Sequence, residues 1–501
     1  MAFAITQTCC NDASCVSVCP VNCIHPTPDE PDFGTTEMLY VDPRTCIDCG
    51  ACADACPVDA IFPVESLTGP LREYADLNAG YYAGRDPLAE AADPAPNFHA
   101  WGPPVFTRVI PGDFPAPEVA VVGTGPAGMY AVQDLLLHTS ATVTLIDRLP
   151  VAGGLVRYGV APDHPSTKKI GETFARFHNH PRLRLRLGVE VGRDVTVDEL
   201  AAQHDAVIYA VGASSARRLG IAGEDLPGSL AATDVVAWYN GHPDVDPRSV
   251  DLSAERVVVV GNGNVALDVA RILTTDPASL EGTSISPEAL ALLKSSKVRE
   301  VVLLGRRGPD AAACTRPELL ALARHEDIDL VVDTHDPRVA ETIDAAAPAD
   351  KAGLLKDVVH ETVDWSAPPA HQRRRIVLRF HSAPQEILGD GQVRALRVSG
   401  SGGDVEIPAG QVIRAVGYRG KPVPGLPFDD DRGVVPNSAG RVEGRPGAYV
   451  VGWIKRGPSG GIGANKTCAE ETVGALIDDI VEGRISVRGK PRRATRSLRR
   501  R

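Results

Sequence analysis

The sequence predicts an α/β fold preceded by a small α+β domain at the N-terminus. Two apolar segments, one at 119–122 and one within 254–273, each run into a glycine-rich loop and then into a helical pattern. That order is typical of Rossmann-like dinucleotide-binding domains. Nine of the 11 cysteines lie in the first 56 residues, before either glycine loop. A chain of 501 residues is too long for one hydrophobic core, so several domains are expected.

Composition and charge exclude several classes of protein. The chain is 43% hydrophobic and 23% charged, which is ordinary for a globular enzyme. It has no apolar run long enough to cross a membrane, and the segment MAFAITQTCC lacks the basic and apolar regions of a secretory signal, so we expect no membrane insertion and a cytoplasmic location. The net charge of −12 argues against a nucleic-acid-binding face. Residues 484–501 hold nine bases and no acid, and we expect this basic tail to be solvated.

The cysteines point to iron–sulfur chemistry. Residues 46–57 read C-I-D-C-G-A-C-A-D-A-C-P, which is the C-x2-C-x2-C-x3-C-P run of bacterial ferredoxins. A zinc site would instead need two cysteine pairs. The same pattern occurs 37 residues earlier, where Cys9, Cys15 and Cys19 align with Cys46, Cys52 and Cys56. Asp12 stands in the earlier run where the later one has Cys49.

The repeat predicts two clusters, because the fourth cysteine of each run ligates the cluster of the other run. A 4Fe-4S cluster would take Cys46, Cys49, Cys52 and Cys19. The second cluster has only three thiolates, from Cys9, Cys15 and Cys56. It is therefore either a 3Fe-4S cluster or a 4Fe-4S cluster with Asp12 or Cys10 as the fourth ligand. Cys23 aligns with Ala60 and is expected to be a buried free thiol.

The first glycine loop follows a Pro- and Gly-rich segment, 67–115, which we interpret as a linker. The loop G-T-G-P-A-G contains Gly123, Gly125, Ala127 and Gly128. Its glycines allow the tight turn, the approach of a pyrophosphate and close helix–strand packing. The next strand ends at Asp147, whose carboxylate would bind ribose hydroxyls and repel a 2′-phosphate. This site is therefore predicted to bind FAD or NAD.

The second loop, G-N-G-N-V-A, has Gly261 and Gly263 in the leading glycine positions. Here the following strand ends in Arg306 and Arg307 instead of an acid. Two guanidiniums can clamp a 2′-phosphate through forked hydrogen bonds, so this site is predicted to prefer NADP(H). Outside the N-terminal region Cys314 and Cys468 are isolated, and the cysteine pair of a disulfide reductase is missing.

Several segments closely resemble the adrenodoxin-reductase family of ferredoxin–NADP⁺ reductases. They lie within residues 116–480 and are RLPVAGGLVRYGVAPDHPSTKKI (148–170), GNGNVALDVARIL (261–273), LGRRGP (304–309), VGYRGKPVPGLPFDD (416–430) and VGWIKRGPSGGIGANK (451–466). With the N-terminal cysteine runs, nearly the whole chain resembles bacterial fusions of a ferredoxin to such a reductase.

The resemblance implies roles for individual residues. Asp147 and Leu155 would contact FAD, and Glu190 would lie on a strand bordering its adenine side. His164 would border the flavin, and it is the candidate catalytic residue, assisting positioning or proton transfer, unless its role is structural. The residues implied to lie along the isoalloxazine are Trp453, Gly460, Gly461 and Ile462. Those implied to bind NADP(H) are Asn262, Gly263, Asn264, Val265, Arg306, Arg307 and Glu318, with Gly460 also touching the nicotinamide.

We therefore expect an FAD-dependent ferredoxin–NADP⁺ reductase that transfers electrons between NADPH and ferredoxin- or cytochrome-type acceptors, as a monomer. Two alternatives remain open. One is an electron-input subunit resembling the small subunit of glutamate synthase, and the other is a flavin oxidase with a non-redox iron–sulfur docking module. The expected organisation is an iron–sulfur domain (1–66), a linker (67–115), an FAD-binding domain (116–217 and 427–483), an NADP-binding domain (218–426) and a basic tail (484–501).

Overall fold

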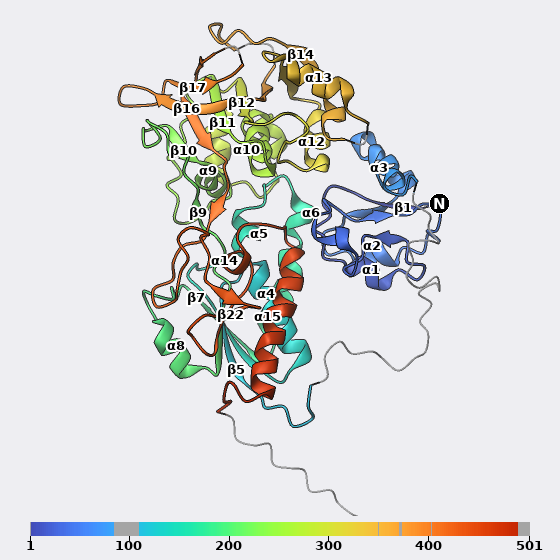
Figure 1. Cartoon of the computed structure of the whole chain (residues 1–501), viewed down its shortest axis with the longest axis vertical. Coiled ribbons are helices and arrows are strands. Elements are labelled where there is room, and N and C mark those ends of the chain that lie inside the picture. The colour runs from blue at the N-terminus through green and yellow to red at the C-terminus, as the bar shows by residue number, and fades with distance from the viewer. Residues whose placement is uncertain (1, 85–109, 349, 370–372, 402, 489–501) are drawn as a thin grey trace, which may run out of the picture. The chain divides into compact units, whose positions relative to one another are not determined.

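The computed structural model describes residues 2–84, 110–348, 350–369, 373–401 and 403–488 (Figure 1). These residues form two compact units. One contains the N-terminal module, which we define as residues 2–84, together with 158–169 and the second nucleotide domain, 216–418. The other is the first nucleotide domain, made of 110–157, 170–215 and 419–488. Most of the predicted linker (85–109) and most of the predicted basic tail (489–501) lie outside the described residues.

The first nucleotide domain is built on a seven-stranded sheet in the order β21-β22-β23-β8-β5-β6-β7. The five strands from β23 to β7 are parallel, and β21 and β22 continue the sheet in antiparallel fashion. The central strand, β5, has four buried residues out of five, as expected for a parallel strand covered on both faces. The strands are β5 (Glu118–Val122), β6 (Thr142–Asp147), β7 (Leu183–Leu187), β8 (Ala206–Tyr209), β21 (Asn437–Ser438), β22 (Arg441–Val442) and β23 (Ala448–Val450).

Two long helices of this domain, α4 and α15, pack side by side against the sheet (Figure 1). Helix α4 begins directly after the glycine loop that follows β5, so the sheet fixes the position of its N-terminus. The helices are α4 (Pro126–His138), α5 (Gly154–Tyr158), α7 (Ile170–Ala175), η4 (Arg176–Asn179), α8 (Val197–Gln203), α14 (Trp453–Arg456) and α15 (Ala464–Val481).

The second nucleotide domain has its own seven-stranded sheet, in the order β10-β19-β11-β12-β15-β13-β14, and all of its pairings are parallel. All five residues of β11 and of β12 are buried, which explains the continuous apolar sequence of these strands. The strands are β10 (Ser229–Ala231), β11 (Arg256–Val260), β12 (Glu300–Leu304), β13 (Asp329–Asp333), β14 (Val359–Glu361), β15 (Arg375–Arg379) and β19 (Gln411–Arg414).

A smaller antiparallel sheet of three strands packs its apolar side chains against this parallel sheet. Its strands are β16 (Ala383–Leu388), β17 (Ala395–Ser399) and β18 (Val405–Pro408). The helices in this unit outside the N-terminal module are α6 (Pro165–Lys168), α9 (Ala232–Tyr239), α10 (Asn264–Thr274), η5 (Pro277–Leu280), α11 (Pro287–Lys294), α12 (Arg316–Ala323), α13 (Pro337–Ala345) and η6 (Ala352–Leu355). Two further short strands, β9 (Ser215–Ala216) and β20 (Tyr418–Arg419), lie at the ends of this domain.

The N-terminal module has the backbone of a duplicated unit. β1 pairs with β4 and β2 with β3, both antiparallel, and the short helices α1 and α2 pack together. Residues with left-handed backbone recur 37 positions apart, at 11 and 48, 13 and 50, and 22 and 59. The sequence repeat is therefore also a structural repeat. The elements are β1 (Phe3–Ile5), α1 (Ser14–Val18), β2 (Ile24–His25), η1 (Pro31–Gly34), β3 (Tyr40–Val41), α2 (Ala51–Ala55), β4 (Ile61–Pro63) and η2 (Val64–Ser66).

Part of the segment predicted as linker is folded onto this module. η3 (Gly69–Arg72) continues into α3 (Glu73–Tyr81). The side chain of Asn78 on α3 is buried, and its Oδ1 accepts hydrogen bonds from the backbone N–H groups of Ile5 (3.1 Å) and Val41 (2.8 Å). Its Nδ2 donates to the Ile5 carbonyl at 2.9 Å. One amide therefore joins α3 to β1 and β3.

None of the helices formed by the described residues is both long enough and apolar enough to span a bilayer.

Candidate functional site

One group of predicted iron–sulfur ligands lines a common cavity in the N-terminal module. Cys9, Cys15 and Cys56 surround it, together with Cys10 and Asp12. The apolar part of the wall is made by Ile5, Leu39, Val58, Ala60 and Ile61. The crossed pattern expected from the repeat is therefore present, because Cys56 of the second run faces two cysteines of the first. The donor set fits an iron–sulfur cluster with three thiolates.

The remaining predicted ligands form a second group. Cys52 interacts electrostatically with Cys19, Cys46 and Cys49, so the cysteine from the first run again joins three from the second. Cys23 is buried, and its Sγ lies 3.3 Å from that of Cys19. The hydrogen bond between the two thiols lowers the pKa of Cys19, which favours the thiolate that a metal requires.

Most of these thiols are held in apolar surroundings. Burial raises the pKa of Cys9 to about 11 and that of Cys52 to about 11, and neighbouring thiols add to both shifts. Thiols in such a setting stay protonated unless a cation is bound among them.

The first glycine loop connects β5 to α4. Gly123 has φ of 114°, and a Cβ at this position would lie 2.3 Å from the Ala210 carbonyl oxygen. A Cβ at Gly128 would lie 2.0 Å from the carbonyl oxygen of Gly123. At Gly125, in contrast, the nearest atom to a Cβ is 3.9 Å away. The loop is therefore tight toward the sheet and open above Gly125, as pyrophosphate binding needs.

The start of α4 offers free donors to an anion. Gly125 is the N-cap, Pro126 and Ala127 follow it, and no side chain caps the helix. Uncapped N–H groups at a helix N-terminus favour a phosphate. The residues of this segment fit the pyrophosphate of a dinucleotide.

Asp147 lies at the end of β6 and holds the glycine loop. Its Oδ2 accepts hydrogen bonds from the N–H (2.8 Å) and the hydroxyl (2.6 Å) of Thr124, and its Oδ1 accepts from the N–H of Leu149 at 2.9 Å. The Thr124 hydroxyl also accepts from the N–H of Gly153 at 3.0 Å. The carboxylate expected at the ribose thus also orders the loop, and the sequence did not indicate a role for Thr124.

Two further predicted FAD contacts lie nearby in the chain. Leu155 is on α5, and its side chain is exposed. Glu190 was expected on a strand, but β7 ends at Leu187 and Glu190 follows it. Its carboxylate pairs with Arg193 at 2.6 Å, while the N–H of Val189 donates to the Asp147 carbonyl at 2.9 Å.

The predicted isoalloxazine segment is a loop folded around Trp453. The indole Nε1 donates to the carbonyls of Ser459 (3.1 Å) and Gly460 (3.2 Å), which closes the loop onto α14. Asn465, near the start of α15, donates to the carbonyls of Gly461 and Ile462 at 3.0 and 3.1 Å. All four predicted residues therefore belong to one hydrogen-bonded loop of the first nucleotide domain.

The second glycine loop connects β11 to α10 in the same way as the first. Gly261 has φ of 128°, and a Cβ there would meet the Ala415 carbonyl oxygen at 2.3 Å. Gly263 is the uncapped N-cap of α10, which continues with Asn264 and Val265. The two asparagines bind the loop 312–315: Asn262 Oδ1 accepts from the N–H of Ala313 at 3.3 Å, and Asn264 Oδ1 from that of Thr315 at 2.8 Å.

Arg306 and Arg307 follow β12 and are exposed. Their guanidiniums make no ion pair or side-chain hydrogen bond with the described residues. Two exposed, unengaged guanidiniums after the second strand of a nucleotide domain suit an anionic ligand such as a 2′-phosphate.

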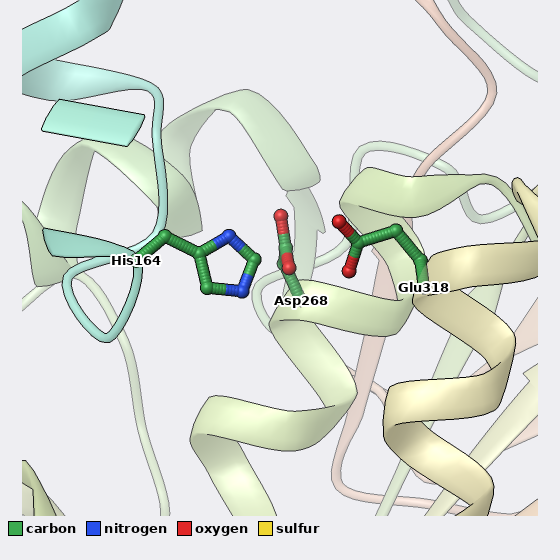
Figure 2. A group of neighbouring side chains, drawn as sticks. All are labelled: His164, Asp268 and Glu318. Carbon is green, nitrogen blue, oxygen red and sulfur yellow. The ribbon is translucent and has the colours of Figure 1, made fainter. Parts of the chain in front are cut away.

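A third cluster gathers three half-buried side chains from different elements. His164 precedes α6, Asp268 lies on α10 and Glu318 on α12, and their side chains face one another (Figure 2). The nitrogen and oxygen atoms of the three lie within 4.8 Å of one another. Burial, and secondarily the charge of Asp268, raises the pKa of Glu318. The resemblance named two of these residues, and the structure brings them together.

Arg271 completes this cluster. Its guanidinium contacts Asp163 at 2.8 Å, Asp268 at 2.8 Å and the Nε2 of His164 at 3.1 Å. Because a guanidinium can only donate, Nε2 accepts this bond and its lone pair is used. A fixed cation among the carboxylates also disfavours a metal ion there, so the cluster is better suited to holding protons.

Sequence reasoning missed Asp163, Asp268 and Arg271. A signal was present, because Asp268 and Arg271 are the only charged residues of α10, which is largely apolar between its two ends. Spaced by three, they lie on one side of the helix. Charged residues on a largely buried helix indicate partners across the interface.

Comparisons with known proteins agree with this arrangement. Residues 117–303 match the family described as pyridine nucleotide-disulphide oxidoreductase, and residues 39–62 match the 4Fe-4S binding domain. Over 496 residues the chain is 48% identical to the probable ferredoxin/ferredoxin–NADP reductase of Mycobacterium tuberculosis, covering 97% of this chain and 85% of that protein. It is 46% identical over 383 residues to the NADPH-ferredoxin reductase FprA of the same species, covering 72% and 84%.

The solved structure of Mycobacterium tuberculosis FprA in complex with NADPH matches with a TM-score of 0.67 and 43% sequence identity. The match covers 74% of this chain and 86% of that one. Both predictions of the sequence, the α/β fold with an N-terminal ferredoxin-type domain and the family, are confirmed. The chain belongs to the ferredoxin/ferredoxin–NADP reductase family.

Proposed function

We propose that this chain is a flavin- and iron–sulfur-dependent oxidoreductase that transfers electrons between NADPH and ferredoxin- or cytochrome-type one-electron acceptors. The observation that carries the proposal is the combination of two uncapped glycine-loop helix starts, at Gly125 and Gly263, with two groups of cysteines on one chain. The likeness to named NADPH-ferredoxin reductases supports it.

The first nucleotide domain would bind FAD and the second would bind NADP(H). When bound, FAD exchanges a hydride with NADP(H) and single electrons with iron–sulfur clusters. The first glycine loop and Asp147 would hold FAD. The separate loop that follows α14, which Trp453 closes by its hydrogen bonds, would lie along the isoalloxazine. Asn262, Asn264 and Val265 would lie at the NADP(H) pyrophosphate, and Arg306 and Arg307 would bind the 2′-phosphate. The assignment of Arg306 and Arg307 to the 2′-phosphate predicts a preference for NADPH over NADH.

His164, Asp268 and Glu318 would hold and position protons beside the reacting rings. The raised pKa of Glu318 keeps its carboxyl protonated to a higher pH than usual, so it can donate a hydrogen bond. Arg271 donates a hydrogen bond to His164 Nε2 and thereby fixes the orientation of the ring. These side chains would orient the nicotinamide and keep the local charge balanced.

We also propose one 4Fe-4S cluster, on Cys19, Cys46, Cys49 and Cys52, and a 3Fe-4S or second 4Fe-4S cluster on Cys9, Cys15 and Cys56. We further propose that the protein acts as a monomer in the cytoplasm. Light scattering coupled to size-exclusion chromatography and cell fractionation test these last two points.

An anaerobic titration of the pure holoprotein with NADPH tests the function, with visible absorbance and EPR recorded on the same samples. We expect the flavin absorbance to bleach and a cluster signal to change with it. Flavin reduction with silent clusters would contradict the internal path and leave a reductase for an external partner. No reaction with NADPH would overturn the function itself.

A further inference from the structure

The N-terminal module supplies an acidic cap to a helix of the second nucleotide domain. The Oε2 of Glu37 accepts a hydrogen bond from the backbone N–H of Arg316, the first residue of α12, at 2.6 Å. The preceding residue, Thr315, makes no side-chain cap of its own. A carboxylate at this position satisfies a free donor of the helix and faces the positive end of its dipole. Glu37 therefore acts as the cap although it is distant in sequence.

The same carboxylate is linked to the loop that precedes α12. The Oε1 of Glu37 lies 3.6 Å from the Nζ of Lys351, and both side chains are half-buried. Lys351 in turn donates to the carbonyls of Ala312 (3.0 Å) and Cys314 (3.1 Å). Glu37 and Lys351 thus hold both the loop 312–315 and the start of the helix.

The other side of that loop contacts the second glycine loop. The N–H groups of Ala313 and Thr315 donate to Asn262 and Asn264, and Asn264 Nδ2 donates back to the hydroxyl of Thr315 at 3.3 Å. A continuous series of contacts therefore runs from Glu37, through the loop 312–315, to the two asparagines. Helix α12, which Glu37 caps, also carries Glu318.

Glu37 is one of several residues of the module that contact the rest of this compact unit, which is the second nucleotide domain and the segment 158–169. Glu73 pairs with Arg324 at 2.6 Å, the hydroxyl of Tyr74 donates to the Pro317 carbonyl at 3.4 Å, and Asp59 pairs with Lys169. Helix α3 lies beside α12 in Figure 1. In each ion pair the acid is on the module and the base is outside it, so the charges are complementary and the contact is specific.

We propose that Glu37 of the iron–sulfur module is a positioning residue for the NADP(H) site, because it holds the loop 312–315 against Asn262 and Asn264. This inference rests on the proposed function, since it takes the second nucleotide domain as the NADP(H)-binding domain. It makes the module a structural part of nucleotide binding in addition to its redox role.

The test compares Glu37→Ala, Glu37→Gln and the control Glu65→Ala in the full-length holoprotein. Glu65 is an exposed acid of the same module, so its removal changes the module charge equally. The dissociation constant of NADP⁺ is measured by flavin difference absorbance. The KM and kcat for NADPH are measured with ferricyanide, which takes electrons directly from the flavin. Iron content and cluster absorbance are recorded for every variant.

We expect Glu37→Ala to raise the dissociation constant and the KM by about three- to tenfold, with kcat unchanged. This fold-change corresponds to the free energy usually lost when a helix cap is removed. Glu37→Gln should stay closer to the wild type, because its amide oxygen can accept the same hydrogen bond. Glu65→Ala should match the wild type. If Glu37 acted only within the module, Glu37→Ala would alter the cluster absorbance and leave the nucleotide affinity unchanged.

A second variant covers the case in which Glu37→Ala loses its clusters. Lys351→Met removes the other hold on the loop without changing the module, and we expect a similar rise in KM. Unchanged affinity in Lys351→Met, or in a Glu37→Ala protein with intact clusters, would overturn the inference. A wild-type protein that does not bind NADP⁺ at all would instead overturn the proposed function, so the two failures are distinguishable.

Discussion

Cys19 and Cys56 are equivalent residues of the duplicated module, and each sulfur accepts a hydrogen bond from the backbone N–H four residues later. The donors are Cys23 at 3.4 Å and Ala60 at 3.2 Å. The N–H groups of Cys19 and Cys56 also donate to carbonyls three residues earlier, both at 3.2 Å. The two halves therefore present their fourth cysteine in the same backbone setting. The difference between the predicted clusters lies instead at Asp12, which occupies the position in the first half that Cys49 occupies in the second.

The first prediction concerns this difference. If the cluster at Cys9, Cys15 and Cys56 holds three irons, Asp12→Cys should convert it to a four-iron cluster, because it completes the thiolate set. Iron and sulfide analysis with EPR of the anaerobically purified protein measures the change. Cys10→Ser is the matched control and should leave the iron content as in the wild type. Loss of iron in Cys10→Ser would instead identify Cys10 as the fourth ligand.

The second prediction concerns coenzyme choice. The double variant Arg306→Ala, Arg307→Ala should lose affinity for NADPH and keep its weaker activity with NADH. Each lost charge-assisted contact should cost about 1.5–3 kcal/mol. Because NADH lacks the 2′-phosphate, it is the internal control for general damage to the domain. KM values for both coenzymes, measured with ferricyanide, check this. An equal change for the two would show that these arginines do not bind the 2′-phosphate.

The third prediction follows from the raised pKa of Glu318. Between the ordinary value of about 4.5 and the raised one, the unfolded chain has lost the proton that the folded protein keeps. The free energy of unfolding contributed by this group therefore falls as pH rises through that interval. Glu318→Gln cannot ionise, so its stability relative to the wild type should rise over the same interval.

Urea denaturation at a series of pH values above about 4.5 measures this difference. The exposed Glu326, on the loop after α12, provides the control variant Glu326→Gln, which should follow the wild type. A stability difference between Glu318→Gln and the wild type that stays constant with pH would contradict the prediction.

The fourth prediction concerns Asn78. Asn78→Leu should lower the free energy of unfolding of the N-terminal module by about 3 kcal/mol, because it leaves the N–H groups of Ile5 and Val41 buried without a partner. Loss of cluster absorbance in urea reports unfolding of this module. Asp76→Leu, on the exposed side of the same helix, is the control. Equal midpoints for the two variants would show that the amide contributes nothing.

The parts of the molecule that the sequence predicted are those set by local patterns. Gly123 and Gly261 are required by the tight turns after β5 and β11, and the apolar strands before them are buried as expected. Asp12 was recognised as a departure because its repeat partner is Cys49. In the first case the information lies in neighbouring residues, and in the second it lies in the comparison of two copies of one repeat.

Contacts between distant segments were not predictable in this way. Helix α3 lacks the apolar face by which a packed helix is recognised in a sequence. The buried amide of Asn78 attaches it to the module instead. Glu37 and Arg316 are 279 positions apart, and nothing near either residue indicates the other. Asp268 and Arg271 carried a signal, but the side chains that meet them come from separate elements.

The attachment of α3 by Asn78 has a consequence for how the module can be separated or exchanged. A cut after residue 66 would remove the helix whose side chain satisfies β1 and β3, and would leave three buried backbone groups of the two strands without partners. The smallest segment that keeps these strands satisfied extends through α3, which ends at Tyr81. A fusion or domain swap that transfers this module intact must therefore carry the helix as well as the two cysteine runs.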